Sequence, residues 1–285
     1  MTRETFMYDG LRQIWKEAFN EDDAYIDFFL KEGLPLGHLH TYGPNDAPFS
    51  ALTLFPLTFH QAGVNYSGFY LYALGTLHSK RGLGYGKLLL KTVEKYALDT
   101  GCHFILLQPT NFSLFEYYHR LGYTEPIYRA FIECSRDTLS SNLLNSPLFT
   151  HFSNLSAPLE NPFLTQKPFY NRFIWPPSLI KYIRKECIFR GGIVTNGAFC
   201  YPHIDTNGPF IEIKEFHITA EKVNTLFESI LHAFPNFSRF RFYGKPQIDI
   251  HSSIQQAPFA LIHFVNPDLK QHYVPLNSYF ALGLD

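Results

Sequence analysis

The sequence lacks features that mark several classes of protein. Its 285 residues hold 24 Lys and Arg against 25 Asp and Glu, a formal net charge of −1, so the chain has no excess positive charge to hold a nucleic acid. No apolar stretch approaches the roughly 20 residues that a membrane span needs, and residues 1–20 lack the apolar core of a signal peptide. We therefore expect a cytoplasmic protein that binds neither nucleic acid nor a membrane.

Cysteine is scarce as well. The four cysteines, at positions 102, 134, 187 and 200, form no Cys-x-x-Cys pair, and a chain of this length does not need disulfides to fold. His38 and His40 would point the same way on a strand, but no cysteine or carboxylate stands at ligand spacing beside them. We expect reduced thiols packed in the interior and no metal.

The chain is rich in apolar and aromatic residues. They make up 46% and 17% of it, against 17% charged residues, which indicates a folded globular protein rather than a disordered one. The length suits two domains of roughly 150 residues each. Residues 135–167 are rich in Ser, Asn and Pro and have no periodic pattern, so we place a linker there, between a first domain at 1–134 and a second at 168–285.

The first half alternates predicted helices and strands. Apolar residues at helical spacing from Asp9 predict a helix, and the pair Asp22–Asp23 predicts the N-cap of a second helix that ends near Gly33. Ser113 and Glu116 have the spacing of a capping box, which predicts the start of another helix. The remaining elements are strands at 49–59, 66–76, 104–107 and 128–134, and a helix from near Lys87 to Gly101.

The second half repeats the order of elements of the first. The pattern predicts a helix at 177–187 that opens on a proline, strands at 193–202 and 209–218, a helix capped by Thr219 and a strand at 239–243. It differs in one respect: no glycine stands between its second strand and the helix that follows.

A glycine-rich loop joins the strand at 66–76 to the next helix. Three glycines alternate in Arg81-Gly-Leu-Gly-Tyr-Gly86, and such a loop at a helix N-terminus presents backbone N–H groups to an anion such as a diphosphate. A Walker A loop would need Gly at position 81 and Ser or Thr at 88, where Arg and Leu stand. The dinucleotide pattern would place its third glycine on Lys87. Neither of these patterns fits.

The loop and a second segment together resemble a known family. The R-x-x-G-x-G pattern at 81–86 is similar to the acetyl-coenzyme A loop of the GNAT-type N-acetyltransferase superfamily. Downstream, Asn111 and the Tyr118-His-Arg-Leu-Gly-Tyr123 segment are similar to that family's second signature. The resemblance covers roughly residues 1–134. It implies an α/β fold with a mixed, mostly antiparallel sheet flanked by helices, and the second half resembles a smaller, degenerate copy.

The resemblance also implies which residues bind acetyl-CoA as co-substrate. The loop amides and Arg81 would hold the diphosphate, the strand before the loop would pair with the pantetheine arm, and Asn111 either hydrogen-bonds that arm or caps a turn. The residues expected to bind the co-substrate are Leu74, Thr76, Arg81, Gly82, Leu83, Gly84, Tyr85, Gly86, Lys87 and Asn111.

Transfer to an amine needs an acid and a route for a proton. The resemblance places the acid, which protonates the leaving thiolate, on Tyr118, and makes Tyr117 a core residue or a wall of the substrate pocket. Some relatives use a Glu on the strand before the loop, but residues 68–76 contain no acid. The candidates for proton removal are His78, Glu116 and a chain of water molecules.

These observations predict an acetyl-CoA-dependent N-acetyltransferase that acts on a primary amine of a small molecule or peptide. The alternative is a non-catalytic protein that senses or holds acyl-CoA. A transferase that uses aminoacyl-tRNA also has two copies of this fold, but the balanced charge argues against a polyanionic partner. The second half either walls the acceptor cleft or mediates formation of a homodimer.

Overall fold

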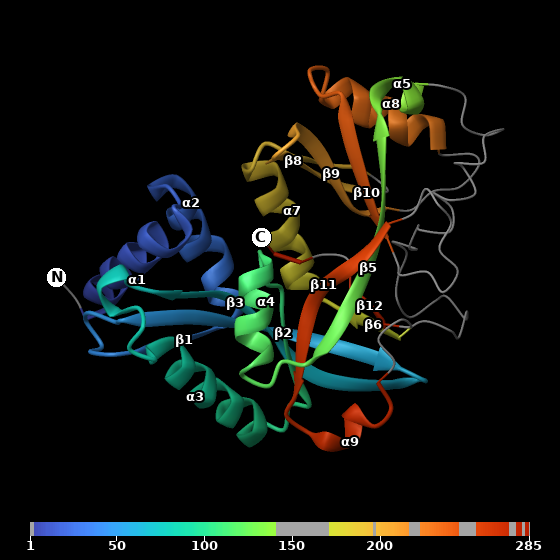
Figure 1. Ribbon diagram of the computed structural model, residues 1–285. Coiled ribbons are helices and arrows are strands. Elements are labelled where there is room, and N and C mark those ends of the chain that lie inside the picture. Colours follow the sequence, from blue (N-terminus) through green and yellow to red (C-terminus); the bar gives the residue numbers. More distant parts are fainter. Residues whose placement is uncertain are drawn as a thin grey trace.

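The computed structural model describes residues 3–140, 171–195, 198–216, 223–244, 255–273, 278–280 and 283–284. The strands in these ranges form one twisted sheet in the order β12-β6-β2-β3-β4-β11-β5-β10-β9-β8-β7, with β1 paired to β2 (Figure 1). Helices lie against both faces, so the expected mixed α/β fold is confirmed. None of the described helices is long and apolar enough to cross a membrane.

Two helices open the chain, as predicted. They are α1 (Arg3–Phe19) and α2 (Asp23–Phe28), and α2 continues as a short π-helix to Gly33. Asp22 caps α2, since its carboxylate accepts a hydrogen bond of 2.8 Å from the backbone N–H of Tyr25. Between the helices Asn20 adopts a left-handed conformation, with φ +56°, which the short polar side chain of Asn tolerates.

The next elements build the part of the sheet that carries the glycine loop. They are β1 (His38–Tyr42), β2 (Ser50–Gln61), β3 (Val64–Thr76), α3 (Tyr85–Asp99) and β4 (Phe104–Leu107). β2 and β3 pair antiparallel, whereas β3 and β4 run parallel because α3 connects them. Helix α3 begins two residues before the predicted start, at the residue that follows Gly84.

The capping-box prediction is wrong. Asn111 is the N-cap of α4 (Phe112–His119), and its side-chain oxygen accepts a hydrogen bond of 3.0 Å from the N–H of Leu114. Ser113 is already inside the helix and donates a hydrogen bond of 2.7 Å to the same Asn111 oxygen. Asn and Ser are both good N-cap residues, so the sequence alone did not decide between two neighbouring starts. The strand β5 (Glu125–Ser135) and the short helix α5 (Arg136–Ser140) follow.

The second half repeats the hairpin, helix and parallel strand of the first. Most of the predicted linker, residues 141–167, and Thr219, the predicted cap, lie outside the described residues. The first residues of the predicted linker, 135–140, belong instead to the end of β5 and to α5. β9 and β10 run parallel, as β3 and β4 do, and β8 pairs antiparallel with β9. The elements are β6 (Asn171–Ile174), α7 (Pro177–Phe189), β7 (Ile193–Val194), β8 (Ala198–Asp205), β9 (Gly208–Phe216), α8 (Val223–Ala233) and β10 (Arg239–Gly244).

The two halves exchange strands at the centre of the sheet. β11 (Gln255–Phe264) lies between β4 and β5, although it follows β10 in the sequence (Figure 1). β5, from the first half, pairs in turn with β10. No helix or strand was predicted after Tyr243, so β11, α9 (Pro267–Lys270) and β12 (Ser278–Tyr279) are additions from the structure. As a result, the sheet is continuous across the two proposed domains.

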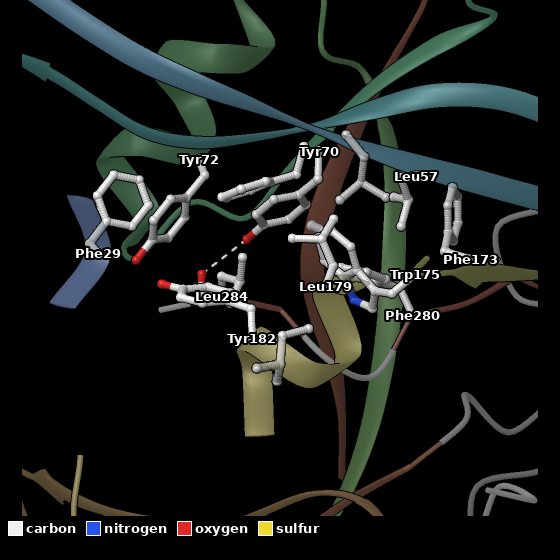
Figure 2. Close-up of a cluster of buried hydrophobic side chains, with 14 of the residues drawn as sticks. Phe29, Leu57, Tyr70, Tyr72, Phe173, Trp175, Leu179, Tyr182, Phe280 and Leu284 are labelled. Carbon is white, nitrogen blue, oxygen red and sulfur yellow. Dashed lines mark hydrogen bonds between the residues drawn. The ribbon is translucent and has the colours of Figure 1, made fainter. Parts of the chain in front are cut away.

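Aromatic side chains fill the space between this sheet and the helices α1, α2 and α7. Trp15 stacks on Phe29 with ring centroids 4.5 Å apart, and Tyr72 packs on both rings. Figure 2 shows how Trp175, Tyr182 and Phe280 of the second half enter the same cluster beneath Tyr70. The two halves therefore share one hydrophobic core.

The four cysteines are free thiols, three buried and Cys134 half-buried, as expected. His38 and His40 on β1 pack against the ring of Tyr96, with ring centroids 5.8 and 4.8 Å apart. Among the residues that the structure describes, no group of three or more His, Cys, Asp or Glu side chains is arranged to hold a metal.

Candidate active site

A cleft of about 770 Å³ opens where β3 and β4 separate. The two strands pair from Gly68–Phe104 to Leu71–Leu107, and β3 then continues to Thr76 without β4 beside it. The backbone edge of β3 beyond Leu71 therefore faces the cleft, and its other edge stays paired with β2. Helix α3 and the glycine loop close one side of this space, and α1 and α4 line others.

β3 carries a bulge at the same place. Its pairing with β2 passes from Tyr72–Thr53 to Gly75–Ala51, so Ala73 and Leu74 lie opposite the single residue Leu52. Ala73 has φ +54°, a left-handed conformation that is rare for alanine. Such strain costs on the order of 1–3 kcal/mol and is maintained only where the surrounding structure fixes it. The bulge changes the direction of the backbone amides at the point where β3 borders the cleft.

The glycine loop adopts the geometry that an anion site needs. Gly82 and Gly84 have φ +77° and +81°, and Gly84 is the N-cap of α3. A Cβ at either position would have no atom within 4 Å, so open space surrounds both. The first intrahelical hydrogen bond is donated by Leu88 to Gly84, at 3.0 Å. The backbone N–H groups of residues 85–87, in the first turn of α3, precede this hydrogen bond. A helix leaves such N–H groups without an internal partner, so they are available to a ligand.

Arg81 ties the loop to its neighbours. Its Nε donates to the carbonyl of Thr76 at 3.2 Å, and its Nη2 donates to the carbonyl of Glu17 at 3.3 Å, so the guanidinium joins the end of β3 to α1. Lys80 and Lys87 also line the cleft. Together these three side chains make the loop side of the cleft positively charged, which favours an anionic ligand there.

His78 lies outside the cleft lining. Its side chain is exposed, and its backbone N–H donates a hydrogen bond of 2.6 Å to the carboxylate of Glu17. That hydrogen bond lowers the pKa of Glu17. Leu83 is 60% exposed and Glu116 is exposed, and neither is among the residues that line the cleft.

Tyr118 and Tyr117 reach the cleft from α4. Tyr118 is 8% exposed and packs edge-on against Tyr117 and Tyr123, with ring centroids 5.1 and 5.8 Å away. Burial raises the pKa of Tyr118, so its hydroxyl is protonated at neutral pH. The Tyr117 hydroxyl lies 3.6 Å from where a Cβ on Gly86 would stand, beside the start of α3. Both tyrosines therefore line the same space.

The structure brings together most of the predicted binding residues. Apart from Leu83, all of them line this one cleft, and so does Tyr118: Leu74, Thr76, Arg81, Gly82, Gly84, Tyr85, Gly86, Lys87 and Asn111. Asn111 also caps α4 through its side-chain oxygen. The capping role uses the oxygen of that amide and leaves its NH₂ group, so capping and ligand binding are compatible.

Sequence reasoning missed three kinds of residue in the cleft. Glu21, in the connection between α1 and α2, is the one carboxylate among the described lining residues. The pair Asp22–Asp23 was interpreted as a helix cap, and the third acid directly before it, Glu21, was the available signal for a site residue. Trp15 and Phe19 of α1 line the same side. At the floor, the Tyr70 hydroxyl donates a hydrogen bond of 3.0 Å to the carbonyl of Leu284 (Figure 2).

The comparisons with known proteins agree with this geometry. The model of the acetyltransferase (GNAT) family matches residues 5–123. No curated protein matches the sequence. Among solved structures, a GCN5-related N-acetyltransferase from Kribbella flavida has a TM-score of 0.60 at 13% identity, and the match covers 94% of this chain and 71% of that one.

Two further structures have a similar fold. A probable N-acyltransferase from Enterococcus faecalis has a TM-score of 0.61 at 14% identity, and the match covers 94% of this chain and 71% of that one. A GCN5-related N-acetyltransferase from Anabaena variabilis has a TM-score of 0.59 at 13% identity, and the match covers 93% of this chain and 72% of that one. At such low identity these structures show the fold, whereas the family match gives the chemistry. Residues 5–123 are therefore an acetyltransferase (GNAT) domain, and the chain is an acyltransferase.

Proposed function

We propose that this chain transfers the acetyl group of acetyl-CoA to a primary amine of a small molecule or peptide, by direct attack of the amine on the thioester. The observation that carries the proposal is the cleft between the separated strands β3 and β4, with two left-handed glycines at the start of α3 on its border. The residues fit the co-substrate: open space surrounds Gly82 and Gly84, and three cations line the loop side.

Each part of the cleft has a separate role in this proposal. The first-turn N–H groups of α3 hold the diphosphate, with Lys87 and Arg81 adding positive charge. The free edge of β3 beyond Leu71 pairs with the amide groups of the pantetheine arm, and the NH₂ of Asn111 donates to the same arm. The bulge at Ala73 supports backbone amides that stabilise the oxyanion formed on the thioester carbonyl.

During the reaction the amine nitrogen loses protons and the leaving thiolate gains one. An amine with an ordinary pKa near 10 is mostly protonated at pH 7 and must lose a proton before it attacks. His78 is exposed and outside the lining, so we assign this step to solvent in the cleft, where Glu21 is the carboxylate that lines it. After it attacks, the nitrogen loses its second proton to the same solvent. The thiolate that leaves takes a proton from the Tyr118 hydroxyl as the carbon–sulfur bond breaks, and solvent then returns a proton to the tyrosine. Burial raises the pKa of Tyr118, so the hydroxyl carries its proton before the transfer.

The test is a thiol-release assay with purified protein, acetyl-CoA and a panel of primary amines. We expect thiol to appear with at least one amine well above the rate of acetyl-CoA hydrolysis measured without amine. Calorimetry with coenzyme A on the same preparation should show saturable binding. The proposal fails if coenzyme A does not bind, and the acceptor class is wrong if it binds but no amine accelerates thiol release.

A further inference from the structure

A second cavity, of about 750 Å³, borders the α1–α2 connection at Glu21 and Asp22. The first half contributes Glu21, Asp22 and Tyr25, and the second half contributes the end of α7 and residues of β8 and β9. Glu21 lines both this cavity and the cleft of the proposed active site, so the two spaces adjoin at that residue. The second half thus forms a wall that the first half alone does not have.

The boundary between the two spaces also contains a pair of tyrosine hydroxyls. Tyr72 lines the cleft and Tyr25 lines the second cavity, and their hydroxyl oxygens are 2.9 Å apart. This hydrogen bond fixes both rings, since Tyr25 is 2% exposed and Tyr72 is 5% exposed. A molecule that extends from the cleft past Glu21 would therefore meet a rigid, preformed second space.

The walls of the second cavity favour positive charge. Three carboxylates line it, on Glu21, Asp22 and Glu186, against the guanidinium of Arg190. The imidazole of His203 also lines it and lies 3.2 Å from the carboxylate of Glu212. Arg190 lies 2.7 Å from the carboxylates of both Glu21 and Glu186. One cation shared between two acids leaves the lining with a net negative charge, which attracts a further cation.

Aromatic rings in the same walls also favour a bound cation. The rings of Tyr25 and Phe189 lie 5.9 Å apart, and Phe189 remains 44% exposed. The Arg190 guanidinium already sits over the face of Tyr25, 3.7 Å from its centre, which shows that the wall accepts a cation on an aromatic face. Tyr201 adds a third ring. Carboxylates and ring faces together suit an ammonium group carried on an apolar chain.

We propose that the second cavity binds the remote end of the acceptor and selects an amine that carries a second positive charge. This inference rests on the proposed transfer to an amine. The reacting nitrogen lies in the cleft, the chain of the acceptor passes Glu21, and the second ammonium lies among Glu21, Asp22, Glu186 and the ring of Phe189. The substrate class is then a diamine or a longer polycationic amine rather than a simple alkylamine.

The test compares two probes of equal chain length, 1,6-diaminohexane and n-hexylamine, which differ only in the second ammonium. Their binding to the full chain is measured by calorimetry at low ionic strength, with and without coenzyme A. We expect the diamine to bind about tenfold more tightly, the effect of one favourable ion pair or cation–π contact. Glu21→Gln should remove most of this preference. Phe189→Leu, which keeps apolar bulk but removes the ring, should reduce it.

Asp27→Asn is the matched control. Asp27 is an exposed acid of α2 that pairs with Arg12 and lines neither cavity, so the preference for the diamine should be unchanged. Thermal unfolding of each variant reports whether it folds. Equal affinity of the wild type for both probes, binding of neither probe, or an unchanged preference in Glu21→Gln would each overturn the inference. Because this measurement needs no turnover, its failure is separate from a failure to bind coenzyme A or to release thiol.

Discussion

The proposed anion site at the start of α3 gives the sharpest prediction, based on two substitutions of one glycine. Gly84 has φ +81°, and a Cβ added there would meet no atom within 4 Å, so a small residue meets strain but no clash. Asn and Asp have nearly the same shape and both tolerate this conformation better than other residues. Gly84→Asn and Gly84→Asp therefore impose the same backbone cost and differ by one negative charge.

That charge determines the size of the effect on coenzyme A binding. At a separation of about 5 Å, two like charges repel by ~0.8 kcal/mol in water and by ~3 kcal/mol at the effective dielectric constant near a protein surface. The Kd of the Asp variant for coenzyme A should then exceed that of the Asn variant by between about fourfold and two-hundredfold. At 1 M salt, where the Debye length is about 3 Å, most of this difference should disappear.

Calorimetry with coenzyme A and thermal unfolding of the free protein together make the comparison decisive. A negative charge at the N-terminus of α3 interacts favourably with the helix dipole, so the Asp variant should be at least as stable as the Asn variant. Affinity and stability should thus change in opposite directions, and loss of folding cannot imitate the result. Equal Kd values for the two variants at low salt would refute the assignment of the diphosphate to this helix terminus.

Three further predictions concern the acid, the packing and the surface charges. Tyr118→Phe should lower kcat by about a hundredfold or more with an unchanged Kd for coenzyme A, measured by thiol release and calorimetry, whereas Tyr117→Phe should retain most of kcat. Gly68→Ala would place a Cβ 2.5 Å from the ring of Phe104, so the free energy of unfolding in denaturant should fall by about 1–3 kcal/mol. Burial opposes ionisation of Glu133, but hydrogen bonds from two arginines of β10 lower its pKa on balance. A lowered pKa in the folded state stabilises the protein above the unfolded value, so stability should fall as pH drops below about 4, and Glu133→Gln should flatten that decline.

The sequence by itself determined the local elements and the loop. Helical spacing located α1, Asp22 marked the cap of α2, and the glycines at 82 and 84 marked a turn that needs positive φ, because each of these depends on residues a few positions apart. Where two neighbouring caps were equally good, at Asn111 and Ser113, local chemistry did not choose.

Only the tertiary structure decided how distant segments meet. The pairing of β11 with β4 and β5 joins residues far apart in sequence, and no local period reports such a partner. The same holds for the separation of β3 from β4 beyond Leu71, which creates the cleft. It also holds for Glu21, whose position between two cavities depends on α7 and β8 of the second half. Caps and turns depend on residues that are neighbours along the chain. A site between strands and helices depends on how segments far apart in the sequence pack against one another.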